Sequence, residues 1–177
     1  FNDLVTLVST GKADLAISKL SRTLARARTV KFSTPYMTFK QGLLFNRLQL
    51  SKVASENEVH LYIRNYTGTL GVIEASSYAN YAKENFPKAV IKEYKSWEDA
   101  VKALKNNEVL AVYRDELEIK RVLANTPNSG LLFKPVYFTD LTDPIAIAVH
   151  KENTQLFFWL NIFLEAQQKQ TADSILA

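Results

Sequence analysis

The chain has 177 residues, 47% of them hydrophobic and 23% charged, which is the composition of a globular protein with a sizeable core. The lack of Cys excludes a disulfide framework and a thiol nucleophile, and the low content of Gly and Pro excludes a fibrous or disordered chain. The net charge is +4, but the 22 basic residues are spread among 18 acidic ones without a basic block, which argues against a nucleic-acid partner.

The first 45 residues alternate between short helical and strand patterns. Apolar residues from Leu4 to Val8 share one helical face, and Gly11 is a natural stop. Thr23 stands where a helix cap belongs. We expect a helix at 4–8, a buried strand at 14–17, a helix at 24–29 and strands at 30–32 and 41–45.

The middle of the chain begins with a polar, irregular stretch at residues 47–65 and then alternates regularly. Ser76 and Ser77 precede a helical segment as N-caps, and residues 96–99 resemble a capping box. We expect strands at 70–73, 90–94 and 109–113, helices at 78–85, 96–106 and 115–124, and a loop at 125–130.

The last part of the chain contains a strand pattern at 145–149 and a long amphipathic helix near 153–170, whose aromatic residues at 157–159 we interpret as core. No segment approaches the ~20 continuous apolar residues of a membrane span, and we expect any targeting segment to lie outside the given sequence. Strands that alternate with short helices predict an α/β fold with mostly parallel, doubly wound sheets. Ligands in such sheets bind at the carboxyl ends of strands.

Three expected strand ends carry polar residues that suit a ligand. The first runs from Ser18 to Arg26, where free backbone N–H groups and the Ser21 hydroxyl suit an anion and Arg26 can fork onto a carboxylate. The second holds Ser76 and Ser77, which serve equally as helix caps. The third ends at Asp115, which either caps the next helix or holds an ammonium group. Arg26 and Asp115 together complement the two charges of a free α-amino acid.

At these same positions the sequence resembles family 3 of the bacterial extracellular solute-binding proteins. The resemblance rests on Gly11 to Ser18 (GKADLAIS), on Leu20 to Thr23 (LSRT) with Arg26, and on Val30 to Tyr36 (VKFSTPY). It continues through residues 70–77, 96–104, 110–115 and 145–149, so it covers essentially the whole chain.

The resemblance implies a role for each matching residue. Arg26 would bind the ligand α-carboxylate, and Ser21 would hold the α-amine with Asp115 as its counter-charge. From the opposite lobe Ser77, together with Ser76, would meet the carboxylate. The remaining implied ligand contacts are Phe1, which would pack against the ligand side chain, and Ser18, Lys19 and Tyr78, which would line the side-chain pocket.

The resemblance also implies a two-lobed fold of the periplasmic-binding-protein type II class, with each lobe a mostly parallel sheet flanked by helices. Residues 1–45 and 136–177 would form lobe 1 and residues 46–135 lobe 2, with hinges near 45 and 135 that let the lobes close on a solute. The implied function is that of the periplasmic substrate-binding component of an ABC-type amino-acid transporter, whose partner is a membrane permease.

The sequence departs from the family pattern in three places. The strand, helix and strand that usually precede the position of Phe1 are not in the given sequence, so lobe 1 is expected to be incomplete here. Either the given chain is a fragment, or the protein lacks these elements, in which case the open edge of the sheet favours a partner or a swapped dimer. Lys19 replaces a small residue, which would crowd the cleft or select an acidic ligand unless the side chain is solvated. Ala75 replaces the usual Gly of a turn.

Three other functions remain open on the sequence. The domain could be the sensor of a membrane receptor or kinase, a binder that has lost its ligand, or an enzyme of the superfamily such as a dehydratase. Glu74 and Glu116 are candidate acids, although both also suit a solvated surface. His60 and His150 lack metal-ligand spacing. We expect no catalytic residue, no metal and no cofactor.

Overall fold

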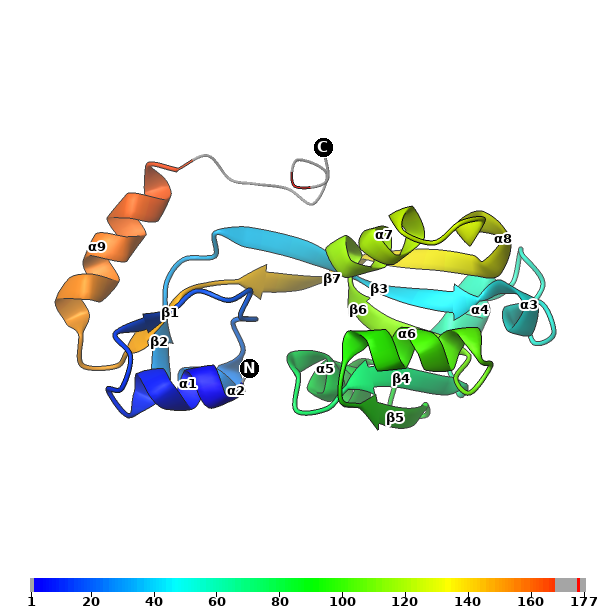
Figure 1. Ribbon diagram of the computed structural model, residues 1–177, viewed down its shortest axis with the longest axis horizontal. Helices are drawn as coiled ribbons and strands as arrows, with labels where there is room; N and C mark the ends of the chain where they lie inside the picture. Colours follow the sequence, from blue (N-terminus) through cyan, green and yellow to red (C-terminus); the bar gives the residue numbers. More distant parts are fainter. Residues whose placement is uncertain (1, 168–174, 176–177) are drawn as a thin grey trace. The chain divides into compact units, whose positions relative to one another are not determined.

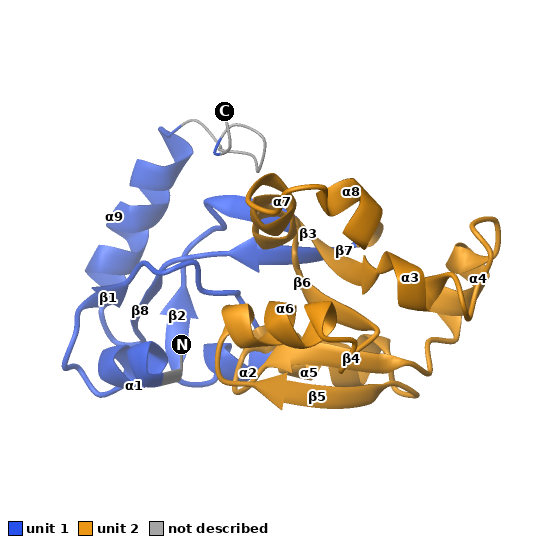
Figure 2. Cartoon of the chain, turned by 45° about the vertical axis from the view of Figure 1, so that its right-hand side comes forward, with its two compact units in different colours: residues 1–39, 141–177 blue, residues 40–140 orange. Residues whose placement is uncertain are grey.

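The computed structural model describes residues 2–167 and 175, and it consists of two compact units (Figure 2). Unit 1 contains Phe1–Phe39 and Leu141–Ala177, and unit 2 contains Lys40–Asp140. Both boundaries fall inside long strands, β3 (Met37–Asn46) and β7 (Phe133–Ile145), so each of these strands runs from one unit into the other. The hinge positions expected near 45 and 135 lie in the same two strands.

Unit 1 is built around a three-stranded sheet with the order β1-β8-β2. Its elements (Figure 1) are α1 (Asn2–Ser9), β1 (Leu15–Ala16), α2 (Leu24–Ala27), β2 (Val30–Phe32), β8 (Ala148–His150), which is labelled in Figure 2, and α9 (Thr154–Glu165). One apolar face of α1, with Val5 and Val8, packs against Leu20, Val30 and Phe32 to form the core of this unit. The helix expected at 4–8, the strand at 30–32 and the cap at Thr23 are confirmed. The strand expected at 14–17 is limited to Leu15–Ala16, with Ile17 59% exposed, and the helix expected at 24–29 ends at Ala27.

The pairing in this sheet differs from the parallel arrangement that we expected. β8 lies between β1 and β2 and is antiparallel to both. The expected continuous strand at 145–149 is also interrupted, because the amide of Ala146 donates to the carbonyl of Leu20 and that of Ile147 to the Ser33 hydroxyl. These bonds replace strand pairing at both residues, so β7 ends at Ile145 and β8 begins at Ala148.

The last described helix, α9, is mostly exposed. Leu160 is its buried residue, and Phe157 packs partly against the cluster of Ile147 and Val149. The interpretation of all three aromatic residues as core was wrong, since Phe158 is 59% and Trp159 56% exposed. The helix ends at Glu165, earlier than expected, and residues 168–170 lie outside the described residues.

Unit 2 contains a five-stranded sheet with the order β5-β4-β6-β3-β7. β4 is parallel to β5 and β6, whereas β3 is antiparallel to β6. Its further elements are α3 (Arg47–Leu50), α4 (Val59–Arg64), β4 (Thr69–Ile73), α5 (Ser77–Asn85), β5 (Val90–Tyr94), α6 (Trp97–Lys105), β6 (Ala111–Asp115), α7 (Glu116–Ala124) and α8 (Ser129–Leu132). The α/β alternation expected for residues 70–124 is confirmed.

Three segments of unit 2 differ from the expectation. Residues 47–65 contain the short helices α3 and α4, the expected loop at 125–130 runs into α8, and β7 was not expected at all. Val59 and Ile63 of α4 are buried in the main core of the unit. Helices this short depend on such tertiary burial for stability, so their local sequence shows only a weak period.

The sheet of unit 2 positions the candidate site. Because β4 and β6 are parallel neighbours, their carboxyl ends lie at the same edge of the sheet. β4 leads through a short turn into the N-terminus of α5, and β6 leads directly into α7. Ser76, Ser77, Tyr78 and Asp115 therefore belong to one edge.

Candidate functional site

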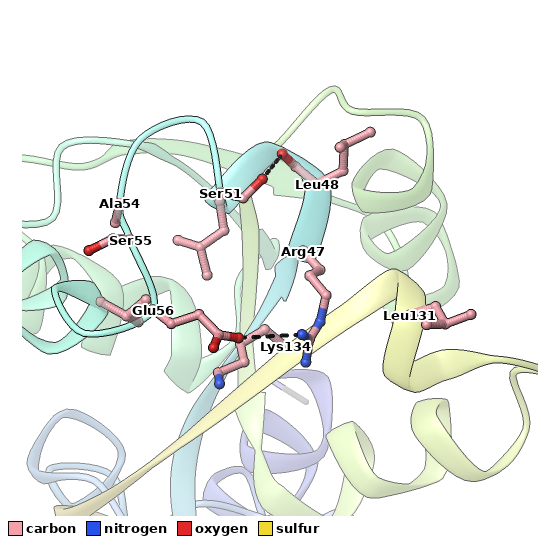
Figure 3. A pocket seen from close by; sticks show the side chains of 10 residues that line it. Arg47, Leu48, Ser51, Ala54, Ser55, Glu56, Leu131 and Lys134 are labelled. Carbon is pink, nitrogen blue, oxygen red and sulfur yellow. Dashed lines mark hydrogen bonds and ion pairs between the residues drawn. The ribbon is translucent and has the colours of Figure 1, made fainter.

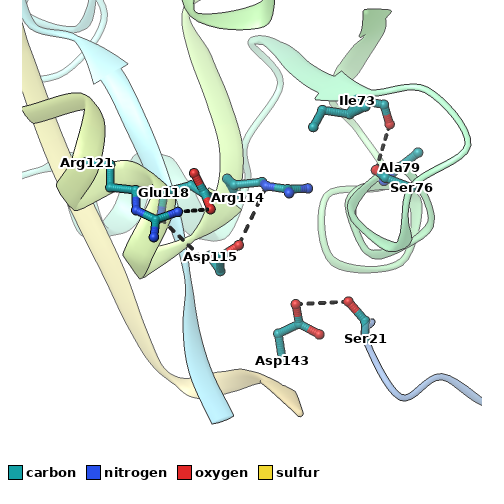
Figure 4. Close-up of polar contacts among 9 residues, drawn as sticks. All are labelled: Ser21, Ile73, Ser76, Ala79, Arg114, Asp115, Glu118, Arg121 and Asp143. Atoms are coloured by element: carbon teal, nitrogen blue, oxygen red, sulfur yellow. Dashed lines mark hydrogen bonds and ion pairs between the residues drawn. The ribbon is translucent and has the colours of Figure 1, made fainter. Parts of the chain in front are cut away.

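The turn between β4 and α5 is held by Ser76, whose hydroxyl oxygen accepts from the amide of Ala79 at 3.3 Å. The same hydroxyl donates to the carbonyl of Ile73 at 2.6 Å (Figure 4). Ser76 is thus the N-cap of α5, and its hydroxyl is engaged in the turn. Ser77 is the first residue of the helix and is buried, with 7% of its surface exposed.

Asp115 serves as the N-cap of α7, which is the structural role that the sequence left open. Its side chain accepts from the amide of Glu118, with Oδ1 3.2 Å from that nitrogen, and only 1% of the residue is exposed. The second oxygen, Oδ2, lies 3.6 Å from Nε of Arg114. A capping role and a charged role in the site are compatible, because they use different oxygens.

Arg114 was missed by the sequence analysis. Only 9% of its surface is exposed, and its Cζ lies 5.5 Å from the ring centre of Tyr78. Its Nε is buried and has no hydrogen-bond partner in the described part of the chain. The available signal was a charged residue directly before Asp115, in a five-residue strand that is buried at every position.

Unit 1 brings Ser21 and Arg26 together. Ser21 precedes α2, and its carbonyl accepts from Nη1 of the half-buried Arg26 at 3.1 Å. Thr23 caps α2 by accepting from the amide of Arg26 at 3.3 Å. The loop and the first turn of α2 therefore orient this guanidinium through both its backbone and its side chain.

Asp143 is the second residue that the sequence analysis missed. It is 1% exposed, and its Oδ2 accepts from the Ser21 hydroxyl at 3.0 Å. The neighbouring residues form an isolated bridge between Ser21 and Ile145, and the amide of Arg22 donates to the carbonyl of Pro144 at 2.8 Å. A buried carboxylate thus lies at the loop that carries Ser21.

The other residues expected to contact the solute differ in how far they are buried. Ser18 is exposed, and Lys19 is half-buried with Nζ 5.2 Å from the ring centre of Phe39. Lys19 has a φ of 51°, in the left-handed region that favours glycine. Tyr78 is 1% exposed in unit 2, and Phe1 lies outside the described residues.

The candidate acids have ordinary surroundings. Glu74 is exposed, whereas Glu116 accepts from the amide of Lys40 at 2.9 Å and pairs with Lys120 at 3.4 Å. His60 is exposed.

Within residues 2–167 and 175, no group of three or more His, Cys, Asp or Glu side chains could hold a metal ion. In the same part of the chain, none of the helices has the length and apolar character needed to cross a membrane.

Unit 2 also contains a cavity of about 410 Å³ that none of the expected site residues lines (Figure 3). Leu50 and Val59 contribute apolar surface, and Arg47 forms an ion pair with Glu56 at 3.6 Å beside Lys134. The cavity is bounded by α3, by the segment that leads to α4, and by the start of β7.

The chain is similar to a family of known proteins and to individual members of it. The model of "Bacterial extracellular solute-binding proteins, family 3" matches residues 1–177. The ABC transporter arginine-binding protein 1 of Escherichia coli (strain K12) is 24% identical over 173 residues, which are 94% of this chain and 65% of that protein. The chain therefore spans about 65% of the length of this curated relative.

Two solved structures show the same architecture. An ancestral arginine-binding protein bound to arginine is 26% identical, with a TM-score of 0.75 over 99% of this chain and 75% of its own. An amino acid ABC transporter substrate-binding protein from Streptococcus pneumoniae bound to L-arginine is 24% identical, with a TM-score of 0.71 over 93% of this chain and 66% of its own. These matches confirm the expected fold class. The chain belongs to family 3 of the bacterial extracellular solute-binding proteins.

Proposed function

We propose that this chain is the main part of a substrate-binding protein that captures a free amino acid for an ABC-type transporter. The observation that carries the proposal is an oriented guanidinium, Arg26, in unit 1 and a buried carboxylate, Asp115, in unit 2. Each is fixed where a strand or loop meets a helix N-terminus, and together they complement the two charges of a zwitterion. The ABC transporter proteins to which the chain is similar support this assignment.

In this proposal Arg26 forms two parallel hydrogen bonds with the α-carboxylate, the geometry for which a guanidinium is suited. Ser21 and Asp115 hold the α-ammonium group, and Ser77 at the N-terminus of α5 adds a donor to the carboxylate. Ser76 contributes mainly by shaping the turn, since its hydroxyl caps α5. Ser18, Lys19, Tyr78 and Phe1 line the side-chain pocket.

We further propose that solute binding closes the two units through bending of β3 and β7. Both strands cross the boundary between the units, and a few residues in each could absorb the change in backbone dihedrals. The protein would act outside the cytoplasm, in the periplasm, and deliver its solute to a membrane permease.

The first test is a thermal-shift screen of the protein against the twenty amino acids, with organic acids and polyamines as controls. A solute at 100 times its Kd should stabilise the fold by about 2.7 kcal/mol, which raises Tm measurably. A response from an amino acid supports the proposal. A folded sample that responds to none of the twenty contradicts it.

The second test removes the proposed carboxylate contact. Arg26→Gln should weaken binding at least ~30-fold by calorimetry, because the loss of one partner of a desolvated charge pair costs about 2–5 kcal/mol. Arg28→Gln is the matched control, since Arg28 is an exposed arginine two residues further along the same segment. Equal effects of the two substitutions would remove Arg26 from the site.

The third test separates the two roles of Asp115. Asp115→Asn keeps an N-cap side chain for α7, because Asn caps helices about as well as Asp, but it removes the negative charge. We expect stability to change little and amino-acid affinity to fall more than about tenfold, which corresponds to about 1.4 kcal/mol. Unchanged affinity in a folded Asp115→Asn variant would leave Asp115 with the capping role alone.

A further inference from the structure

We propose that Arg114 makes the site selective for an amino acid with an acidic side chain. This inference rests on the proposed function and deepens it by naming the class of solute. It assigns to Arg114, which the sequence analysis did not single out, the role of pairing with the anionic group at the end of the solute side chain.

The buried positive charge of Arg114 is poorly compensated within the described part of the chain. Arg114 has only 9% of its surface exposed, and burial of a guanidinium costs several kcal/mol unless hydrogen bonds and an opposite charge offset it. Its ion partner Asp115 approaches Nε at 3.6 Å, which is longer than a hydrogen bond. The other oxygen of Asp115 is engaged with the amide of Glu118. Nε is therefore a buried donor without an acceptor among the described residues.

Within unit 2, Arg114 lies beside the start of α5. Its guanidinium lies over the ring of Tyr78, the second residue of α5, with Cζ 5.5 Å from the ring centre. Figure 4 shows the side chain extending from β6 toward the turn that contains Ser76. Arg114 therefore reaches the edge where β4 and α5 meet, at the expected binding end of the parallel strands.

Two positive features lie at the edge of the sheet where β4 leads into α5. The N-terminus of α5 is the positive end of a nine-residue helix, and a negatively charged group is stabilised there. Arg114 adds a full positive charge at the same edge. Both features favour an anion, and Asp115 approaches the guanidinium of Arg114 at Nε, at a distance of 3.6 Å.

The class of solute follows from the assignment of charges. If Arg26 takes the α-carboxylate and Asp115 the α-ammonium group, a second carboxylate of the solute can form the bidentate pair that Arg114 lacks. The side-chain amide of a neutral solute such as glutamine would accept a hydrogen bond from Arg114, but it would not neutralise the positive charge of the guanidinium. A cationic side chain would lie beside a buried guanidinium and would be repelled.

The test compares glutamate and aspartate with their near-isosteric amides, glutamine and asparagine, and with lysine and arginine, by calorimetry on the unmodified protein. We expect the acidic amino acid to bind at least tenfold more tightly than its amide, and the cationic amino acids to bind most weakly. Arg114→Gln should abolish the preference by weakening the acidic solute at least tenfold while the amide changes less than about threefold.

Arg121→Gln is the matched control, because Arg121 is an exposed arginine on the following helix that pairs with Glu118. It should leave the preference unchanged. If the unmodified protein prefers a neutral or cationic amino acid, the role of Arg114 is overturned while the proposed function stands. If no amino acid binds, both fail. The comparison on the unmodified protein decides the matter even if Arg114→Gln does not fold.

Discussion

Ala75, in the turn between β4 and α5, has a φ of 53° and is thus in the left-handed conformation. This conformation costs an alanine about 1–2 kcal/mol, whereas glycine adopts it without a steric penalty. The position is the one where the family usually has Gly. The turn therefore holds Ala75 in a strained conformation, at the expense of some stability.

Ala75→Gly should stabilise the protein. Relief of the left-handed strain exceeds the roughly 0.4–1 kcal/mol of unfolded-state entropy that glycine adds, so we expect a gain of about 0.5–1 kcal/mol and a Tm higher by about 1–4 °C. Urea unfolding and calorimetry measure both. Ala124→Gly is the control, because Ala124 is an exposed alanine in α7, and it should lower stability. A fall in stability for Ala75→Gly would show that the turn is not strained.

The buried Tyr66 makes the stability of unit 2 depend on pH. It is 1% exposed, its hydroxyl donates to the carbonyl of Thr69 at 2.8 Å, and its ring makes edge contacts with Tyr62 and Phe86. Burial, with a smaller contribution from the nearby Tyr62, raises the pKa of Tyr66 far above its usual value of 10.0. The folded protein therefore keeps this phenol neutral under conditions in which the unfolded chain ionises it.

The sign of the pH dependence follows from this shift. Because the folded pKa of Tyr66 is raised, its contribution to stability is complete below pH about 10 and is lost as the pH rises further, by up to about 1.4 kcal/mol per pH unit. Tyr66→Phe should lose about 1 kcal/mol at pH 7 through its missing hydrogen bond. Between pH 9.5 and about 11 its stability should fall less than that of the unmodified protein. Parallel curves in urea unfolding would contradict the assignment.

At the scale of elements, α5 depends on its cap. Ser76 accepts from the amide of Ala79, and removal of such a cap costs about 0.5–2 kcal/mol. Ser76→Ala should therefore lower the free energy of unfolding by about 1 kcal/mol. Ser77→Ala, one residue further on and inside the helix, should cost less stability but more affinity if Ser77 contacts the solute. Chemical unfolding measures the loss of stability and calorimetry the loss of affinity for each variant. If Ser77→Ala lost more stability and Ser76→Ala more affinity, Ser77 would be the cap and Ser76 the solute contact.

The short helices α3 and α4 were not predicted from the pattern of apolar residues in their own sequence. Asn46 caps α3 by accepting from the amide of Gln49 at 3.1 Å, and α4 buries Val59 and Ile63. A four- or six-residue helix has too few turns to display a helical period, and its stability comes from burial against residues distant in the sequence. The longer helices α5, α6 and α7 were predicted because each has a cap residue and an apolar face of its own.

At the scale of the whole molecule, the two units are linked through β3 and β7. If the solute closes the units, a solute that raises Tm should also lower the radius of gyration measured by small-angle X-ray scattering. The Arg26→Gln variant under the same conditions should show no change, since it lacks the proposed carboxylate contact. A stabilising solute that leaves the radius of gyration unchanged would contradict closure.

The sequence by itself determined the α/β class, the family, and the helix caps at Thr23, Ser76 and Ser96, because these depend on residue types within a few positions of one another. It also indicated the strand ends where Ser21, Arg26 and Asp115 lie. It left the antiparallel pairing of β8, the strand β7 and the exposure of α9 to be decided by contacts between distant segments.

Only the tertiary structure identified Arg114 and Asp143 as buried charges. Asp143 accepts a hydrogen bond from Ser21, a residue 122 positions away, and Arg114 lies over the ring of Tyr78 from a neighbouring parallel strand. The burial of a charged side chain depends on which partners the fold places around it, and that environment has no local signature in the sequence. The periodicity of hydrophobic residues determines elements, whereas the desolvation and pairing of charges are decided by the packed chain.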